Sequence, residues 1–346
     1  MVDQAPSMEE WKELYQVSEK IKDLEPWEWM QEVDLFGIQD PESDQIGFTS
    51  VMGRMGEHFG VFIYLGAEGL YGFWEFQEGH SEEDPMKIFE IPHLQVSFED
   101  RDMLTERDQE IIKELGLKYR GKNAWPQFRS VKPGHLPWYI ESWEARFMTH
   151  ALSQLLDVAE RMKVEAAVLD PKSDDEYLVR VAQHKGDGYT WEDQIMIIPP
   201  PEPQSIKIPM DMGAIDGLSK LPEGDSVIEV DFFMMPSPVK DKNSRPYFPY
   251  MLLIVDQTSG MILGNTKLFP PKPSIDEMVG LIPSVFVDVL SRAGIRPKAI
   301  KVRPGILESV LELLRDDIGF EIEAASDLNM LDQAKRSLIE RFQAMM

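Results

Sequence analysis

The sequence predicts two domains in series: an α+β domain, followed by an α/β domain with a mixed sheet and helices on its faces. Three observations support this. The chain has 346 residues, enough for two domains of ~100–200 residues each. Apolar runs with strand character alternate with segments of helical periodicity. A stiff proline-rich segment, residues 199–203, separates the halves. We therefore expect an acidic α+β domain over residues 1–165, bridging strands and a Pro-rich linker over 166–204, and the α/β domain over 205–346.

The first element is a helix with its own start and stop signals. Ser7 and Glu10 have the spacing of a capping box, in which the serine caps the first turn and the glutamate reaches back to its amide. Apolar residues follow at helical spacing until Pro26, which predicts a helix to about Leu24. Trp27, just after the proline, is typical of a hydrophobic cover over the first core.

The rest of the first half alternates between short strands and helices. Glycine-containing turns between the first three apolar runs favour hairpins. A cap at Thr105 and an apolar stripe after Ser142 predict two further helices. The predicted strands are residues 34–38, 46–52, 59–65, 94–98, 176–182 and 191–198, and the predicted helices are 67–76, 105–116 and one that begins at 142.

The second half has a more regular order of elements. Residues 227–233 and 250–256 are apolar runs rich in β-branched and aromatic residues, and the turn after them, residues 257–260, predicts a third, antiparallel strand. A capping box opens the next helix at Ser274, and Pro283 inside that helix predicts a kink or a late start. The predicted strands are residues 227–233, 250–256, 261–269, 298–302 and 320–323, and the predicted helices are 212–221, 274–294, 306–317 and 327–343.

Composition excludes several classes of protein. The hydrophobic content of 43% is ample for packed cores and argues against disorder throughout. No apolar run approaches the ~20 residues that span a bilayer, and the N-terminus lacks the layout of a signal peptide. The chain has no cysteine, so it has no disulfide, thiolate zinc site or cysteine nucleophile. We expect a cytoplasmic protein that does not enter the membrane.

The negative charge is concentrated in the first part of the chain. The net charge is −26; the first 204 residues carry 19 Lys and Arg against 41 Asp and Glu, and residues 205–346 carry 16 against 20. A surface this acidic repels phosphate backbones, so nucleic acid is not an expected partner of residues 1–204. A solvated acidic surface is the common explanation, and mimicry of nucleic acid is the alternative. We expect the partner, whose identity the sequence does not indicate, to be a protein.

No motif predicts a cofactor or a nucleophile. The glycines between residues 53 and 72 match neither G-x-G-x-x-G nor the phosphate-loop pattern, and turns explain them. The six histidines lack the spacing of a zinc site. No G-x-S-x-G is present, and Ser259 fits a turn better than a nucleophile. We expect neither a metal nor a cofactor.

The order of elements in the second half, β-β-β-α-β-α-β-α, resembles the ribonuclease H-like fold and, more closely, the integrase and transposase catalytic core. In that family the first strand ends in W-x-x-D-x, the second carries V-x-D-x-x-S-G, and the fourth leads to D-N-G. Here Asp231 stands at the first position, residues 254–260 (Ile-Val-Asp-Gln-Thr-Ser-Gly) match the second, and residues 297–305 match the fourth. The resemblance covers roughly residues 225–325. The whole chain also resembles a family of uncharacterised bacterial proteins. The residues that carry this resemblance include Glu57-His58 and the Arg245-Pro-Tyr layout.

The resemblance implies a metal site formed by carboxylates from the first strand, the fourth strand and a late helix, which clamp a transferring phosphoryl group. Asp231 supplies the first carboxylate, but Arg303 stands where the family has aspartate, and a guanidinium cannot ligate a cation. Asp327 and Asp332 are loosely placed candidates for the third. Because the first and fourth strands are neighbours in this fold, we hypothesise that Arg303 pairs with Asp231 in place of a metal. The alternative is that both side chains point to solvent.

The sequence thus predicts a protein of uncharacterised function: a non-catalytic binding or regulatory protein whose second domain is a degenerate ribonuclease H-like domain, with a degenerate site at Asp231, Arg303 and Asp327. One alternative is a metal-dependent nuclease or phosphoryl-transfer enzyme with a rearranged acidic site at Asp231. A second is an acidic adaptor that competes with nucleic acid for a basic partner.

Overall fold

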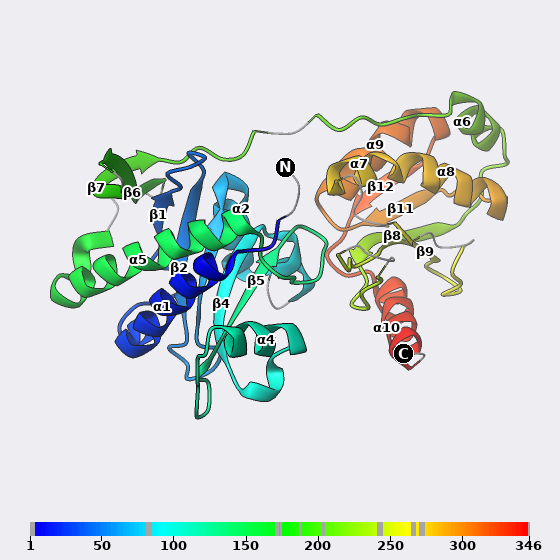
Figure 1. The fold of residues 1–346 in the computed structure, drawn as a ribbon. Helices are drawn as coiled ribbons and strands as arrows, with labels where there is room; N and C mark the ends of the chain where they lie inside the picture. The colour runs from blue at the N-terminus through cyan, green and yellow to red at the C-terminus, as the bar shows by residue number, and fades with distance from the viewer. Residues whose placement is uncertain are drawn as a thin grey trace. The chain divides into compact units, whose positions relative to one another are not determined.

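The chain forms two compact units (Figure 1). The structure is a computed structural model that describes residues 4–80, 85–169, 173, 175–186, 188–202, 205–240, 245–263, 268–269 and 274–344. Unit 1 comprises Met1–Lys132 and Pro137–Glu202, and unit 2 comprises Pro133–Leu136 and Pro203–Met346. No helix in the described part of the chain combines the length and the apolar character needed to cross a membrane.

Unit 1 is built on a mixed sheet that has, among the described residues, seven strands. Neighbouring strands pair antiparallel, except that β1 and β6 are parallel. In spatial order the strands are β5 (Trp125–Val131), β4 (His93–Glu99), β3 (Gly60–Leu65), β2 (Ile46–Met52), β1 (Phe36–Gln39), β6 (Glu176–Lys185) and β7 (Gly188–Ile197).

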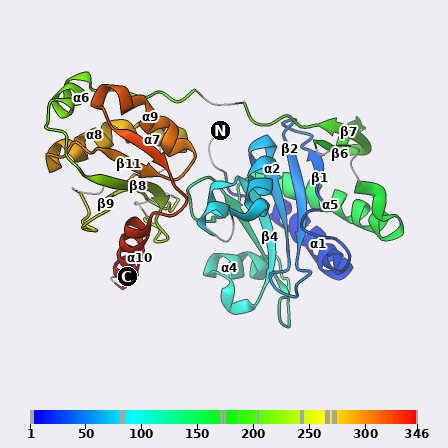
Figure 2. The ribbon, with the colours of Figure 1, turned by 180° about the vertical axis from the view of Figure 1, so that it is seen from behind.

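Helices cover both faces of this sheet (Figures 1 and 2). One core joins α1 (Met8–Leu24) and α5 (Ser142–Val164) to the sheet, and the buried Trp27 belongs to it, as expected. A second core lies under α2 (Gly66–Glu75). The capping box predicted at Ser7 and the cap predicted at Thr105 are present at the starts of α1 and of α4 (Glu106–Glu114), and at Ser274 the serine caps α7 (Ile275–Gly280) of unit 2.

The strands that we expected to bridge the halves lie in the first sheet. The backbone of β6 pairs with β1 and with β7, and Leu178, Val179 and Val181 of β6 are buried. A strand with buried side chains needs neighbours on the sheet, because its N–H and C=O groups must be paired as well. Residues 176–197 therefore complete unit 1.

Unit 2 has a second mixed sheet, with five strands in the described part of the chain. Their spatial order is β10 (Leu268–Phe269), β9 (Tyr250–Asp256), β8 (Val227–Met234), β11 (Ala299–Val302) and β12 (Glu321–Ala324). The first three pair antiparallel, and β8, β11 and β12 run parallel. The expected adjacency of the first and fourth strands, β8 and β11, is therefore confirmed. Of the third predicted strand, residues 264–267 lie outside the described residues.

The helices of unit 2 divide between the faces of its sheet (Figures 1 and 2). One face is covered by α7 (Ile275–Gly280), α8 (Ile282–Ala293) and α9 (Ile306–Ile318), with α6 (Met212–Ser219) beside them, and the other by α10 (Asn329–Ala344). The predicted kink is present: the helix is interrupted at Leu281, and Pro283 lies in the first turn of α8, where its missing N–H costs least.

Candidate functional site

The candidate site lies on the face of the second sheet that α10 covers. Side chains alternate along β8, so Glu229, Asp231 and Phe233 share one face. The amide of Leu331 in α10 donates to Glu229 Oε2 at 2.8 Å, which identifies that face as the one beneath α10. Residue Glu229 is 2% exposed and Asp231 is 8% exposed. Two acidic residues are thus held in a mostly apolar layer, where an unpaired charge is costly.

Arg303 directly follows β11 and meets Asp231 across the parallel pair. Val230 is opposite Val302 in the register, so the next step along both strands brings residues 231 and 303 together. Arg303 Nη1 donates to Asp231 Oδ2 at 2.8 Å. The hypothesised approach of Arg303 to Asp231 is confirmed, and the alternative with both side chains in solvent is wrong.

The same guanidinium also binds a carboxylate on α10. Arg303 Nη2 donates to Asp332 Oδ1 at 2.6 Å, so Arg303 lies between two aspartates from different elements. One turn further along α10, Lys335 Nζ lies 3.6 Å from Asp231 Oδ2 and 4.0 Å from the centroid of the Phe233 ring. Asp231, Arg303, Asp332 and Lys335 form an electroneutral group, which we call the unit 2 network.

Exposure increases outward through the unit 2 network. The side chain of Asp231 is 12% exposed and that of Lys335 is 25% exposed. The outer pair is more accessible, with 34% for Arg303 and 31% for Asp332. Asp231 also accepts a hydrogen bond from the amide of Phe232 at 2.9 Å. The inner carboxylate therefore depends most on its partners, because water reaches it least.

Asp327, the third predicted site residue, does not join the network. It is exposed and precedes α10, and no contact among the described residues links it to Asp231 or Arg303. Asp332 contributes the carboxylate instead, because it lies one turn inside α10 beside the buried Leu331. The spacing of Asp332 and Lys335 on one helix face was a usable signal for this site. Glu229 carried no such signal, because its partner is a backbone amide of α10.

The chemistry of the unit 2 network is that of a closed ion-pair cluster. A guanidinium offers donors and no acceptor, so Arg303 can hold carboxylates but cannot ligate a cation. Within the described residues, no group of three or more His, Asp or Glu side chains has a geometry that could hold a metal ion. The turn after β9 is structural as expected: Ser259 donates its amide and hydroxyl hydrogens to Asp256, and these bonds lower the pKa of that carboxyl.

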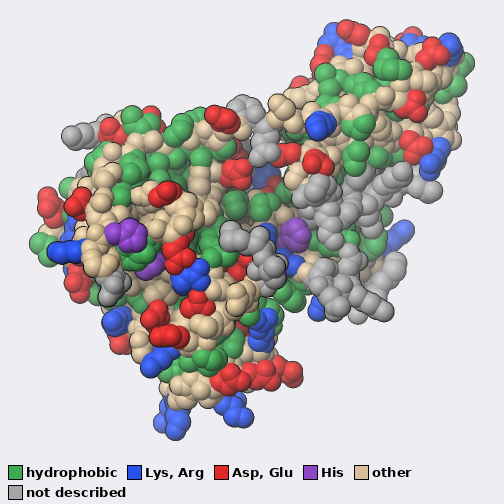
Figure 3. All heavy atoms as spheres, turned by 45° about the horizontal axis from the view of Figure 1, so that its top comes forward, with side chains coloured by type: hydrophobic (Ala, Val, Ile, Leu, Met, Phe, Trp, Pro, Cys, Tyr) green, Lys and Arg blue, Asp and Glu red, His purple; other side chains and the backbone are tan. Residues whose placement is uncertain are grey.

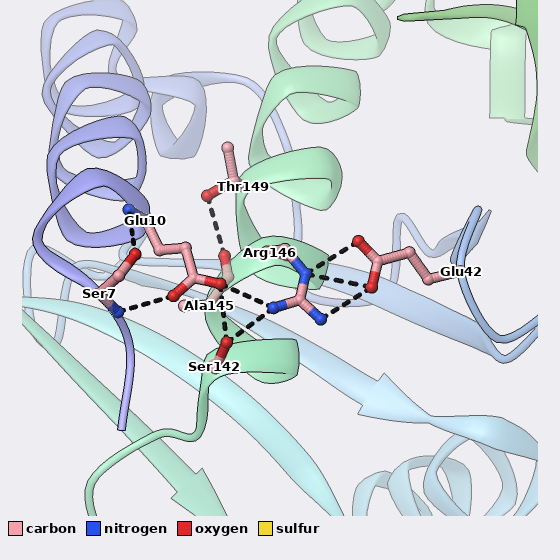
Figure 4. Close-up of polar contacts among 7 residues, drawn as sticks. All are labelled: Ser7, Glu10, Glu42, Ser142, Ala145, Arg146 and Thr149. Atoms are coloured by element: carbon pink, nitrogen blue, oxygen red, sulfur yellow. Dashed lines mark hydrogen bonds and ion pairs between the residues drawn. The ribbon is translucent and has the colours of Figure 1, made fainter. Parts of the chain in front are cut away.

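Unit 1 holds a comparable network around Arg146, shown in Figure 4. Arg146 donates to Glu10 at the start of α1 and to Glu42 in the turn before β2. Burial alone raises the pKa of Glu10, but hydrogen bonds from Ser142, the Ser7 amide and Arg146 outweigh it and lower the pKa to about 2. This network ties two helix starts and a turn together, and its groups serve the fold.

A buried ion pair connects α4 to β5. Arg129 binds both carboxylate oxygens of Asp108, at 2.9 and 2.6 Å. Burial raises the pKa of Asp108, but the bonds from Arg129 and Thr105 outweigh it, so the pKa lies below its ordinary value. Arg129 and the helix cap at Thr105 together occupy the Asp108 carboxylate. This pair too is therefore structural.

Family comparisons assign each half of the chain. Residues 11–180 match the model of a domain of unknown function, DUF7309, and residues 214–339 match that of a second, DUF6930. Each match covers just under half of the chain or less, and together they span most of it. The predicted membership of an uncharacterised family is therefore confirmed, and the whole unit 2 network lies within the DUF6930 match. No curated protein matches the chain.

Among solved structures, the DUF7309–DUF6930 chain is similar to the catalytic core domain of BIV integrase. The identity is 12% and the TM-score is 0.24, and the match covers 34% of this chain and 66% of that one. The chain therefore spans just under two thirds of that domain's length. The fold of unit 2 is defined by its own strand order, β10-β9-β8-β11-β12.

Proposed function

We propose that the DUF6930 unit is a ribonuclease H-like domain in which an ion-pair network replaces the metal site, and that the protein binds or regulates a partner instead of cleaving phosphodiesters. The strand order β10-β9-β8-β11-β12, with helices between and after the parallel strands, supports the fold. Asp231, Arg303 and Asp332 come from the first strand, the end of the fourth strand and the last helix. These are the three positions from which the integrase-like family draws its metal-binding carboxylates.

The observation that carries the proposal is the position of the Arg303 guanidinium between the two aspartates. A divalent cation that bound between the two aspartates would have to displace the guanidinium from both carboxylates. If Arg303 stayed within ~4 Å, it would repel the ion by about 8 kcal/mol at an effective dielectric constant of ~20. Lys335, 3.6 Å from Asp231, would add to this repulsion. The site is therefore organised to neutralise its carboxylates without a metal.

The first test is nuclease activity of the full chain with Mg²⁺ or Mn²⁺ on single- and double-stranded DNA and RNA. We expect no metal-dependent cleavage. Cleavage by the wild type that is lost in Asp231→Asn but kept in Asp316→Asn, a matched change at a 99% exposed side chain, would establish the nuclease alternative instead.

A second test measures the metal directly and needs no substrate. Calorimetric titration of the full chain with Mn²⁺ should show no site that depends on Asp231. An Mn²⁺ site that is present in the wild type and in Asp316→Asn, and absent in Asp231→Asn, would overturn the proposal even if no substrate were found.

A further inference from the structure

A hollow beside α4 in the DUF7309 unit is distinct from both ion-pair networks. Its volume is about 840 Å³, and it is formed by Arg101, α4, the loop after α4 and the start of β5. The side chains that matter for its chemistry are four cations and two aromatic rings: Arg101, Lys113, Lys118, Arg120, Tyr119 and Trp125. Small-molecule sites typically have volumes of ~300–1,000 Å³, so the hollow is large enough for such a ligand.

The four cations of the hollow lie outside the ion pairs that stabilise unit 1. Within the described part of the chain, none of them forms an ion pair, whereas Arg129, Arg146 and Arg180 of the same unit each bind carboxylates. This is notable in a region with more than twice as many acidic as basic residues. Figure 3 shows acidic side chains spread over a face of this unit and a group of Lys and Arg side chains at its lower tip. The lining of the hollow itself has four cations against two glutamates, so its charge is opposite in sign to that of the unit.

An aromatic surface lies among these cations. The rings of Tyr119 and Trp125 are in contact, with centroids 5.6 Å apart at an interplanar angle of 66°, and the Arg101 guanidinium carbon lies 5.8 Å from the Trp125 ring centroid. The Tyr119 hydroxyl donates to Glu19 at 2.7 Å, which holds its ring in place. Trp125 is half-buried, so one part of its indole packs on the core while the rest faces the hollow.

We propose that this hollow binds a nucleoside phosphate. Arginine forks bind phosphate oxygens in pairs, and an indole face stacks on a nucleobase of any identity. Glu106 and Glu110 also line the hollow, and their carboxylates can accept hydrogen bonds from ribose hydroxyls or base amino groups. An acidic peptide fits less well because a chain of Asp and Glu side chains offers no flat ring to stack on Trp125. A nucleic-acid strand fits less well because it would extend over the surrounding acidic surface.

The test is calorimetric titration of the full chain with ADP, GDP, CDP and UDP, and with inorganic pyrophosphate and adenosine as partial ligands. At least one diphosphate should bind, and more tightly than pyrophosphate or adenosine. Arg101→Gln combined with Arg120→Gln should weaken binding about tenfold or more, since two charge-assisted contacts are lost. Arg54→Gln, an exposed arginine outside the hollow, is the matched control and should leave the affinity unchanged.

Three results would overturn the inference. One is that no diphosphate binds, or that the double variant binds as tightly as the wild type. Another is pyrophosphate binding as tightly as every diphosphate, which would remove the role of Trp125. The third is a short oligonucleotide or a poly-glutamate peptide binding more tightly than the diphosphates with the same arginine dependence. Because the hollow and the unit 2 network lie in different units, these outcomes leave the proposed function of DUF6930 untouched.

Discussion

Replacing Arg303 with leucine should destabilise the DUF6930 unit by about 2 kcal/mol. Breaking a fully buried ion pair costs ~3–5 kcal/mol, and an exposed pair contributes ~0–1 kcal/mol. The pair with Asp231 lies between these limits, because its side chains are 34% and 12% exposed. Loss of the guanidinium leaves the Asp231 carboxylate with Lys335 at 3.6 Å and the Phe232 amide as its partners. The cost arises from that poorly solvated charge.

The assay must report on unit 2 alone. All eight tryptophans precede residue 205, so tryptophan fluorescence follows the DUF7309 unit. Amide hydrogen exchange of peptides that cover β8 and β11 follows the sheet that carries the network. A loss of about 2 kcal/mol should speed the exchange of its most protected amides roughly 30-fold, if they exchange by unfolding of the unit.

Two further variants make the measurement decisive. Arg315→Leu removes a half-exposed arginine of the same unit and should change exchange only slightly, by ~0.5 kcal/mol or less. Asp231→Leu combined with Arg303→Leu should cost less than the sum of the single changes, because no buried carboxylate remains. If Arg303→Leu were as mild as Arg315→Leu, or if the double variant were fully additive, the guanidinium would not be compensating Asp231.

The other predictions concern both units. Asp108→Ala should destabilise unit 1 by about 3–5 kcal/mol, because it leaves the buried Arg129 without its carboxylate, and urea unfolding followed by tryptophan fluorescence measures this. The pKa of Glu10 is lowered from its ordinary value of 4.5 to about 2 on folding, so its contribution to stability is present above 4.5 and lost as the pH falls toward 2. Glu10→Gln should therefore reduce the acid sensitivity of unit 1 in thermal melts between these pH values; an unchanged pH dependence would contradict the role of the Arg146 network. Arg303→Asp should gain Mn²⁺-dependent stabilisation that the wild type lacks, because it places a third carboxylate beside Asp231 and Asp332. Thermal melts with and without Mn²⁺ test this. The same melting temperature with and without Mn²⁺ would count against the proposal that the network replaces a metal site.

Local signals predicted most elements and some of the site. The capping boxes at Ser7 and Thr105 and the break near Pro283 are confirmed because each depends on residues within one turn. The meeting of Asp231 and Arg303 followed from the element order, which makes their strands neighbours. Asp327 lies outside the network, and Asp332 lies inside it, because Asp327 precedes α10 while Asp332 lies on the helix face that packs on the sheet. Short-range patterns show that Asp332 and Lys335 share a helix face, but they do not show that β8 and Arg303 lie beneath it.

The amino-acid sequence by itself determined the order of the elements, the acidic character of the first part and the presence of an arginine directly after the fourth strand of the second half. These properties depend on residue identity and on spacings of a few positions. Only the tertiary structure decided that β6 and β7 complete the first sheet, that Asp332 and Lys335 close the network around Arg303, and that four cations line one hollow with Trp125. The physical reason is that strand pairing, helix packing and charge neutralisation are set by residues far apart in the chain, which only folding brings within a few ångströms.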